Sequence, residues 1–288
     1  MSPAALTAAA LAALAAAAPA PAAASGGALG NALGGVLGGG RAAAPAGMVR
    51  LPAGAYRPLY ARPGDGPVRV GAFALDREPA TAGEYLDFVR AHPEWRRSRV
   101  RPVFAERGYL ADWRGDLEPG GPGDAAALRR PVTGVSWFAA RAYCAARGKR
   151  LPTVDEWEYA AAASETRRDA AREPGFVARL LGLYFRRAAR ALPAVGGGFR
   201  NAYGVRDLHE LTWEWTLDFN GVLVSDDSRE AGSGVAARDH DLFCAGAAIG
   251  AAEPGNYPAF MRYALRAGLT GRSTVRTLGV RCAADLAA

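Results

Sequence analysis

Residues 130–161 carry two helix N-termini joined by a short turn, and this block constrains the fold more than any other feature. Ser136 is a typical N-cap for a helix over 137–147, which the glycine that follows would end. The Thr-Val-Asp-Glu run that follows forms a capping box and begins a second helix, over about 154–163. The Gly-Lys-Arg-Leu-Pro turn between them predicts two helices that pack closely together.

Two strands and another helix are predicted before this block. Residues 48–56 predict a first strand closed by a Pro/Gly turn, and residues 68–76 predict a second. Thr81 and Glu84 form a capping box for a helix that ends near residue 91. Residues 92–130, rich in Arg, Gly and Pro, predict a long ordered loop pinned by aromatic side chains. Those aromatic residues are Trp95, Phe104, Tyr109 and Trp113.

Residues 164–198 predict an insertion that contains an amphipathic helix over 177–192. Its apolar face carries Leu180, Leu181 and Tyr184, and its opposite face carries Arg179, Arg186, Arg187 and Arg190. Such a helix either packs on its own domain or contacts a partner or a membrane surface. We expect the first, because amphipathic helices of globular proteins usually pack this way.

The first 40 residues contain no charged side chain. Residues 1–24 predict a secretory signal peptide, with an apolar run, two prolines and an Ala-Ala-Ala cleavage site before Ser25. Residues 25–47 predict a Gly/Ala-rich linker, and 48–288 the folded domain. Export to the periplasm follows from this reading, and a disordered Ala/Gly tail is the alternative. We expect no transmembrane anchor, because the apolar run is shorter than the roughly 20 residues that a span needs.

The charge composition argues against a nucleic-acid partner. The formal net charge is +7, but Lys149 is the only lysine, and the arginines are scattered among acidic residues instead of forming a run. Three cysteines and three histidines, with no CxxC or HExxH motif, also argue against a zinc site.

Four sequence blocks stand in a fixed order along the chain. They are MVRLPAGAY with DREPATAGEYLDFV, then PVTGVSWFAARAYC with GKRLPTVDEWEYAA, then NAYGVRDLHELTWEWT, and finally LGVRCAAD. Together they resemble the formylglycine-generating (sulfatase-modifying factor) family over residues 48–285. The resemblance implies an α+β sulfatase-modifying-factor fold, related to C-type lectin-like domains. We therefore expect a single compact domain with low regular secondary structure.

The catalytic residues of the family do not carry over. Active members bind copper with two cysteines and oxidise a substrate cysteine to formylglycine. Counted back from Leu278, with Arg266 at the family's arginine, the two cysteine positions are Glu253 and Pro258. Without a thiolate pair, copper at the family's site is not expected. The sequence therefore predicts a catalytically divergent member.

Two other cysteines do match the family. Cys144 and Cys282 occupy positions that form a disulfide in exported members, and we expect the same bridge here, with two buried free thiols as the alternative. A second family disulfide would need cysteines at Ala161 and Tyr263, and both are absent.

Candidate chemical groups remain outside the family pattern. Cys244 and His240 are candidates for a nucleophile or a copper ligand, although a buried strand cysteine is the favoured reading. Glu214 and Glu210 are candidates for a structural calcium site. Three scattered histidines, His209 among them, do not reproduce the iron site of ergothioneine-type relatives.

Three functions stay open. The first is an exported accessory or maturation factor for another enzyme, because cysteine-less relatives accompany copper nitrite reductases. The second is a metal-dependent oxidative enzyme with different chemistry, and the third is a lectin-like binding module. In the first reading a monomeric chain grips a protein partner or polypeptide substrate in a retained cleft. The residues assigned to that cleft are Asn256, Tyr257, Phe260, Arg262, Arg266 and Trp213.

Overall fold

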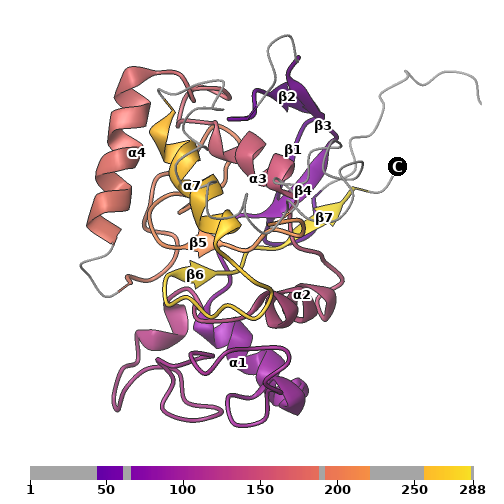
Figure 1. Cartoon of the computed structure of the whole chain (residues 1–288), viewed down its shortest axis with the longest axis vertical. Coiled ribbons are helices and arrows are strands. Elements are labelled where there is room, and N and C mark those ends of the chain that lie inside the picture. The colour runs from indigo at the N-terminus through magenta and orange to yellow at the C-terminus, as the bar shows by residue number, and fades with distance from the viewer. Residues whose placement is uncertain (1–43, 61–65, 188–191, 221–255, 287–288) are drawn as a thin grey trace, which may run out of the picture. The chain divides into compact units, whose positions relative to one another are not determined.

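The computed structural model describes residues 44–60, 66–187, 192–220 and 256–286. Strand β1 (Met48–Leu51) pairs antiparallel with β4 (Phe73–Asp76), which pairs with β7 (Ala283–Asp285). Strands from the start and the end of the domain therefore share one sheet (Figure 1). β2 (Gly54–Tyr56) forms a hairpin with β3 (Val68–Val70), and β5 (Trp213–Glu214) lies parallel to β6 (Leu278–Gly279).

The two strands predicted over 48–56 and 68–76 are each divided in the structure. β1 and β4 belong to the three-stranded sheet, whereas β2 and β3 form a separate pair. Pro52 stands between β1 and β2 and has no N–H to donate, so the ladder cannot continue through it. Prediction of one continuous strand in each range was therefore wrong.

The predicted helix starts are confirmed. Helix α1 (Ala82–Ala91) begins at the Thr81 capping box, α2 (Trp137–Ala145) at Ser136 and α3 (Val154–Ala161) at the Thr153 capping box. The last two end about two residues earlier than predicted. Gly148 follows α2 with a φ of 66°, a left-handed conformation that favours glycine.

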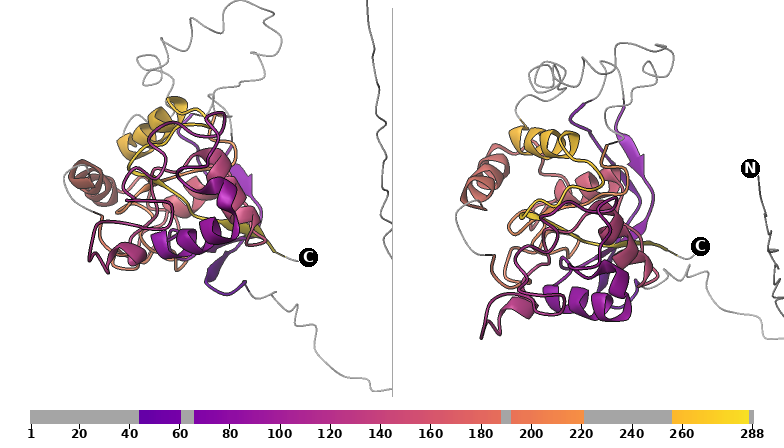
Figure 2. Two further views of the ribbon diagram at one scale, coloured as in Figure 1. Left: turned by 90° about the horizontal axis from the view of Figure 1, so that it is seen from below. Right: turned by 60° about the horizontal axis from the view of Figure 1, so that its bottom comes forward.

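The amphipathic helix α4 (Pro174–Arg187) begins three residues before the predicted start, with proline in its first turn. Leu180 and Tyr184 are buried. Figure 2 shows α4 beside α7 (Tyr257–Ala267), against which it packs. The prediction that this helix packs on its own domain is confirmed.

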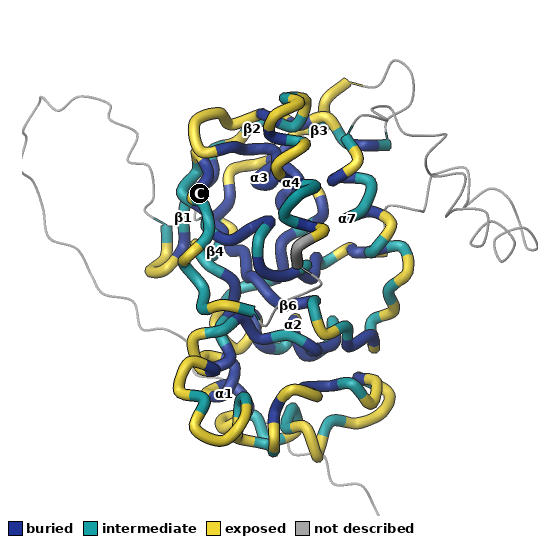
Figure 3. Tube along the Cα trace, turned by 90° about the vertical axis from the view of Figure 1, so that its left-hand side faces the viewer, coloured by how far each residue is buried: buried dark blue, intermediate teal, exposed yellow. Residues whose placement is uncertain are grey.

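Residues 92–130 are an ordered loop, as predicted, with short 3-10 helices η1 (Pro93–Trp95) and η2 (Ala127–Arg129). Tyr109 and Trp113 are buried, and the ring of Trp95 lies 5.9 Å from that of Phe104. In Figure 3 the loop is largely exposed along its outer side, beside α1.

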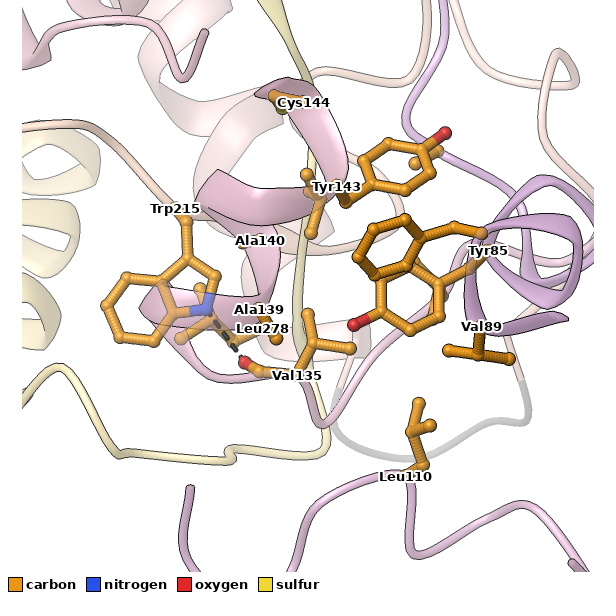
Figure 4. Close-up of a cluster of buried hydrophobic side chains, with 14 of the residues drawn as sticks. Tyr85, Val89, Leu110, Val135, Ala139, Ala140, Tyr143, Cys144, Trp215 and Leu278 are labelled. Carbon is orange, nitrogen blue, oxygen red and sulfur yellow. Dashed lines mark hydrogen bonds between the residues drawn. The ribbon is translucent and has the colours of Figure 1, made fainter. Parts of the chain in front are cut away.

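The largest hydrophobic cluster joins α1, α2 and the segment around β6. Tyr85 stacks on Tyr143 with ring centroids 5.4 Å apart, and its hydroxyl is 2.7 Å from that of Tyr109. The buried Trp215 indole N–H donates to the Val135 carbonyl across 2.8 Å (Figure 4). The hydroxyls of Tyr85 and Tyr109 and the indole N–H of Trp215 thus find partners within the protein.

A disulfide joins Cys144 on α2 to Cys282, next to β7. Both cysteines are fully buried. The pairing expected from the resemblance is confirmed, and it ties the second helix to the last strand of the three-stranded sheet.

Within the described ranges, every helix falls short of the length and apolar character that a membrane span requires.

Candidate functional site

Helix α7 supplies most of the residues assigned to the cleft. The Asn256 side chain caps the helix by accepting from the Ala259 N–H across 3.2 Å, and proline occupies the first turn. Pro258, one of the two family cysteine positions, is buried in that turn. Proline has no side-chain atom that can bind a metal ion. Pro258 therefore cannot supply one of the two thiolates of the family's copper site. The other position, Glu253, lies outside the described residues, as do Cys244 and His240.

Two arginines on the buried face of α7 meet one carboxylate of α3. Arg262 donates from Nε and Nη2 to both Glu158 oxygens at 2.6–3.1 Å. Arg266 donates from Nη1 to Glu158 Oε1 across 2.6 Å. All three side chains are at most 6% exposed. In this structure Arg262 and Arg266 are engaged with Glu158, and their assignment to a binding cleft stays a prediction.

The Glu158 carboxylate stays charged in this buried place because of its two partners. Burial by itself would raise its pKa, but the charges and hydrogen bonds of Arg262 and Arg266 outweigh burial and lower the pKa to about 2. Burial likewise opposes the charge of Arg262, and Glu158 outweighs it and raises the pKa of that guanidinium. The triad is a fixed structural charge cluster over the whole neutral range.

A second buried ion pair joins Arg281 to Glu214. The Trp157 ring lies between this pair and the Glu158 cluster, with the guanidinium carbons of Arg262 and Arg266 5.4 and 5.1 Å from its ring centroid. Its indole N–H donates to Glu214 Oε2 across 2.7 Å, and Arg281 donates to both Glu214 oxygens at 2.9–3.1 Å. Both Glu214 oxygens are thus engaged by Trp157 and Arg281, and the assignment of Glu214 as a calcium ligand stays a prediction.

Glu210 is the other acid predicted to bind calcium. Its Oε1 accepts from the Phe199 N–H across 2.9 Å, and its buried Oε2 has no hydrogen-bond partner among the described residues. Burial raises the pKa of this carboxyl. No group of three Asp, Glu, His or Cys side chains in the described ranges is arranged to hold a metal ion.

His209 is buried between two partners. Its Nε2 lies 3.0 Å from the Ala161 carbonyl, so this nitrogen carries the proton, and Nδ1 then accepts from the Tyr184 hydroxyl at 2.9 Å. Tyr184 in turn accepts from Arg262 Nη1 across 3.0 Å. Because both ring nitrogens are engaged, His209 serves the packing of α4 on this core and is not open to a metal.

The remaining cleft residues lie near the surface in two places. Tyr257 is 48% exposed and stacks on Phe260, ring centroids 5.4 Å apart, at the start of α7. Trp213 lies on β5, half-buried, with its ring 4.8 Å from Tyr184. A cavity of about 30 Å³ beside Asn256 has room for about one water molecule. Among the residues assigned to the cleft, Tyr257 in the first turn of α7 is the most exposed side chain that the structure describes.

The sequence analysis did not pair Glu158 with Arg262 and Arg266. The signal was present: Arg262 and Arg266 are spaced by four residues and lie on the apolar face of α7, with Ala259 and Tyr263. A cation pair on a buried face requires a buried acid. The pairing of Arg281 with Glu214 follows the same logic, because Arg281 stands among buried residues of the last block.

Residues 39–286 match the family described as the sulfatase-modifying factor enzyme 1-like domain. Three curated relatives illustrate its range. The inactive C-alpha-formylglycine-generating enzyme 2 of Bos taurus is 37% identical over 40% of this chain and 48% of its own length. The Bos taurus formylglycine-generating enzyme is 32% identical over 42% of the chain and 40% of its length. The hercynine oxygenase of Mycobacterium tuberculosis is 30% identical over 52% of the chain and 38% of its length. The chain thus spans about half the length, or less, of these relatives.

Proposed function

Because the chain belongs to the sulfatase-modifying factor enzyme 1-like family, we propose that it is an exported accessory or maturation factor for another enzyme. In this proposal it does not generate formylglycine itself. The observation that carries it is Pro258, buried in the first turn of α7 where the resemblance requires a copper-binding thiol. A proline there can neither bind a soft metal ion nor act as a nucleophile.

The surroundings of α7 support the same reading. Around Glu158 the described side chains of Arg262, Arg266 and Trp157 are engaged with one another in ion pairs and ring contacts, which supports a structural role for this interior. Tyr257 and Phe260, at the exposed end of the helix, offer aromatic contact area for a protein partner. A relative named inactive also exists in the family.

The oxidative alternative has less support. The family includes a hercynine oxygenase, but His209 has both ring nitrogens engaged here. A metal would therefore have to be held by other residues. A bound transition metal in the purified chain would favour this alternative.

The proposal also includes export of the chain and its division into three segments. Residues 1–24 are a signal peptide, 25–47 a linker and 48–288 the domain, which acts as a monomer in the periplasm. N-terminal sequencing of the protein from its host should begin at Ser25. A protein that retains residue 1 would contradict export.

The function is tested by deletion of the chain in its host. We expect one exported metalloenzyme, of which copper nitrite reductase is the first candidate, to lose activity and metal content while its polypeptide remains. Complementation with the wild-type chain should restore both, and a Tyr257→Ala/Phe260→Ala variant should restore less. Unchanged activity and metal content in all exported metalloenzymes would overturn the proposal.

A further inference from the structure

A second surface of the domain gathers arginines and aromatic rings from three separate segments. They are the loop residues 99–107, the first turns of α2 and the connection between α7 and β6. We call this the arginine–aromatic surface. Its members are Arg101, Val103, Phe104, Arg107, Phe138, Arg141 and Arg272.

Direct contacts hold the three segments together. The ring of Phe104 lies 5.4 Å from that of Phe138 on α2. The Glu106 N–H donates to the Arg272 carbonyl across 3.0 Å, and the Trp137 N–H donates to the Gly271 carbonyl at the same distance. Backbone and ring contacts thus hold the three segments that carry these arginines beside one another.

The charge of this surface is unbalanced. Arg101, Arg107, Arg141 and Arg272 are exposed, and among the described residues none of the four forms an ion pair. Arg130, Arg150 and Arg276, by contrast, each face a carboxylate. Residues 99–107 contain one acid, Glu106. The nearby Asp116 is already held by Ser98, whose hydroxyl and N–H lower the pKa of that carboxyl.

Two of the arginines are oriented by aromatic rings. The guanidinium carbon of Arg101 lies 5.7 Å from the Phe104 ring centroid, and that of Arg141 lies 5.4 Å from the Trp137 centroid. A guanidinium over a ring keeps its N–H edge available for a carboxylate and loses less side-chain freedom on binding. Val103, 56% exposed, adds an apolar contact at the edge of the surface.

We propose that the arginine–aromatic surface binds an acidic segment of another polypeptide, with carboxylates at the arginines and an apolar side chain beside Val103 and Phe104. Charge complementarity and the mixed apolar contact favour this occupant. A nucleic acid is less suited, because the four arginines come from three separate segments and do not form a run of cations along one element that could follow a phosphate backbone. The surface would bind such a segment whichever reading of the α7 site holds.

The test uses the full chain and a labelled peptide in which glutamates alternate with leucines, followed by fluorescence anisotropy at low salt. A variant with Arg101→Gln, Arg107→Gln, Arg141→Gln and Arg272→Gln should lose about tenfold or more in affinity. The matched control changes four exposed arginines elsewhere, namely Arg69→Gln, Arg77→Gln, Arg129→Gln and Arg200→Gln. It carries the same net charge and should bind within about twofold of the wild type.

Equal loss in both variants would show that only net charge matters and would overturn the proposal. The proposal would also be overturned if a labelled oligonucleotide bound the wild type more tightly than the peptide does, and if only the first variant bound that oligonucleotide more weakly. A photo-crosslinking form of the peptide gives a measurement on the unmodified chain. Its crosslinks should fall within 99–107, 137–141 or 270–273, and crosslinks confined to other segments would contradict the assigned place.

Discussion

Glu158→Gln should strongly destabilise the domain. The change keeps the size of the side chain but leaves Arg262 and Arg266 buried with no opposite charge. Removing one member of a buried ion pair costs about 3–5 kcal/mol. The pKa of about 2, against an ordinary 4.5, gives a consistent figure of about 3 kcal/mol at neutral pH.

The pH dependence has a definite sign. Because folding lowers the pKa of Glu158, its contribution is fully present above pH 4.5 and is lost as the pH falls towards 2. The free energy of unfolding, measured in urea, should therefore differ by about 3 kcal/mol between wild type and Glu158→Gln at pH 7. The difference should shrink at pH 3, where Glu158 is mostly protonated in the unfolded chain but still largely ionised in the folded domain.

The control is Glu106→Gln, an exposed acid outside the cluster, which should change stability by no more than about 0.5 kcal/mol. The reasoning would be refuted if the free energy of unfolding of Glu158→Gln lay within about 1 kcal/mol of the wild-type value at pH 7, because a change that small is typical of a surface substitution. A loss that is equal at pH 7 and pH 3 would refute the electrostatic cause.

Three further changes test other parts of the structure. Reduction, or Cys144→Ser with Cys282→Ser, opens a loop of sequence separation 138 and should cost up to about 5 kcal/mol in the chain-entropy view, seen as a lower Tm than that of the oxidised chain. Thr153→Ala removes the N-cap of α3 and should cost about 1 kcal/mol in urea unfolding, whereas Thr153→Ser should cost much less. Glu210→Gln should raise the free energy of unfolding at pH 7 and change it little at pH 4, because burial favours the protonated carboxyl. A variant that is less stable than wild type, by a difference that grows when calcium is added, would instead show that Glu210 is a metal ligand.

Local signals in the sequence predicted local structure well. The capping boxes at Thr81 and Thr153 begin helices at those positions, and each box closes in both directions as its residues allow. These predictions succeeded because a cap depends on atoms within one turn of the chain. The division of 48–56 was missed because the choice between two sheets depends on strands far along the sequence.

The site was harder to predict because its charges pair over long separations. Glu158 and Arg266 are separated by more than a hundred residues, and no local pattern connects them. The Glu156 carboxylate, two residues earlier, closes the α3 capping box and also binds Arg150 at 2.7 Å. Glu156 therefore caps its own helix, whereas Glu158 pairs with α7. This difference follows from the position of α7 beside α3 and not from the local sequence.

Formylglycine formation is the measurement that tests the central claim most directly. The purified chain, supplied with copper, oxygen and a cysteine peptide of the family's substrate type, is analysed by mass spectrometry beside an active formylglycine-generating enzyme. With Pro258 in place of a thiol, we expect the cysteine of the peptide to remain unchanged while the control enzyme converts it. Repeated turnover of the peptide to formylglycine by this chain would contradict the account.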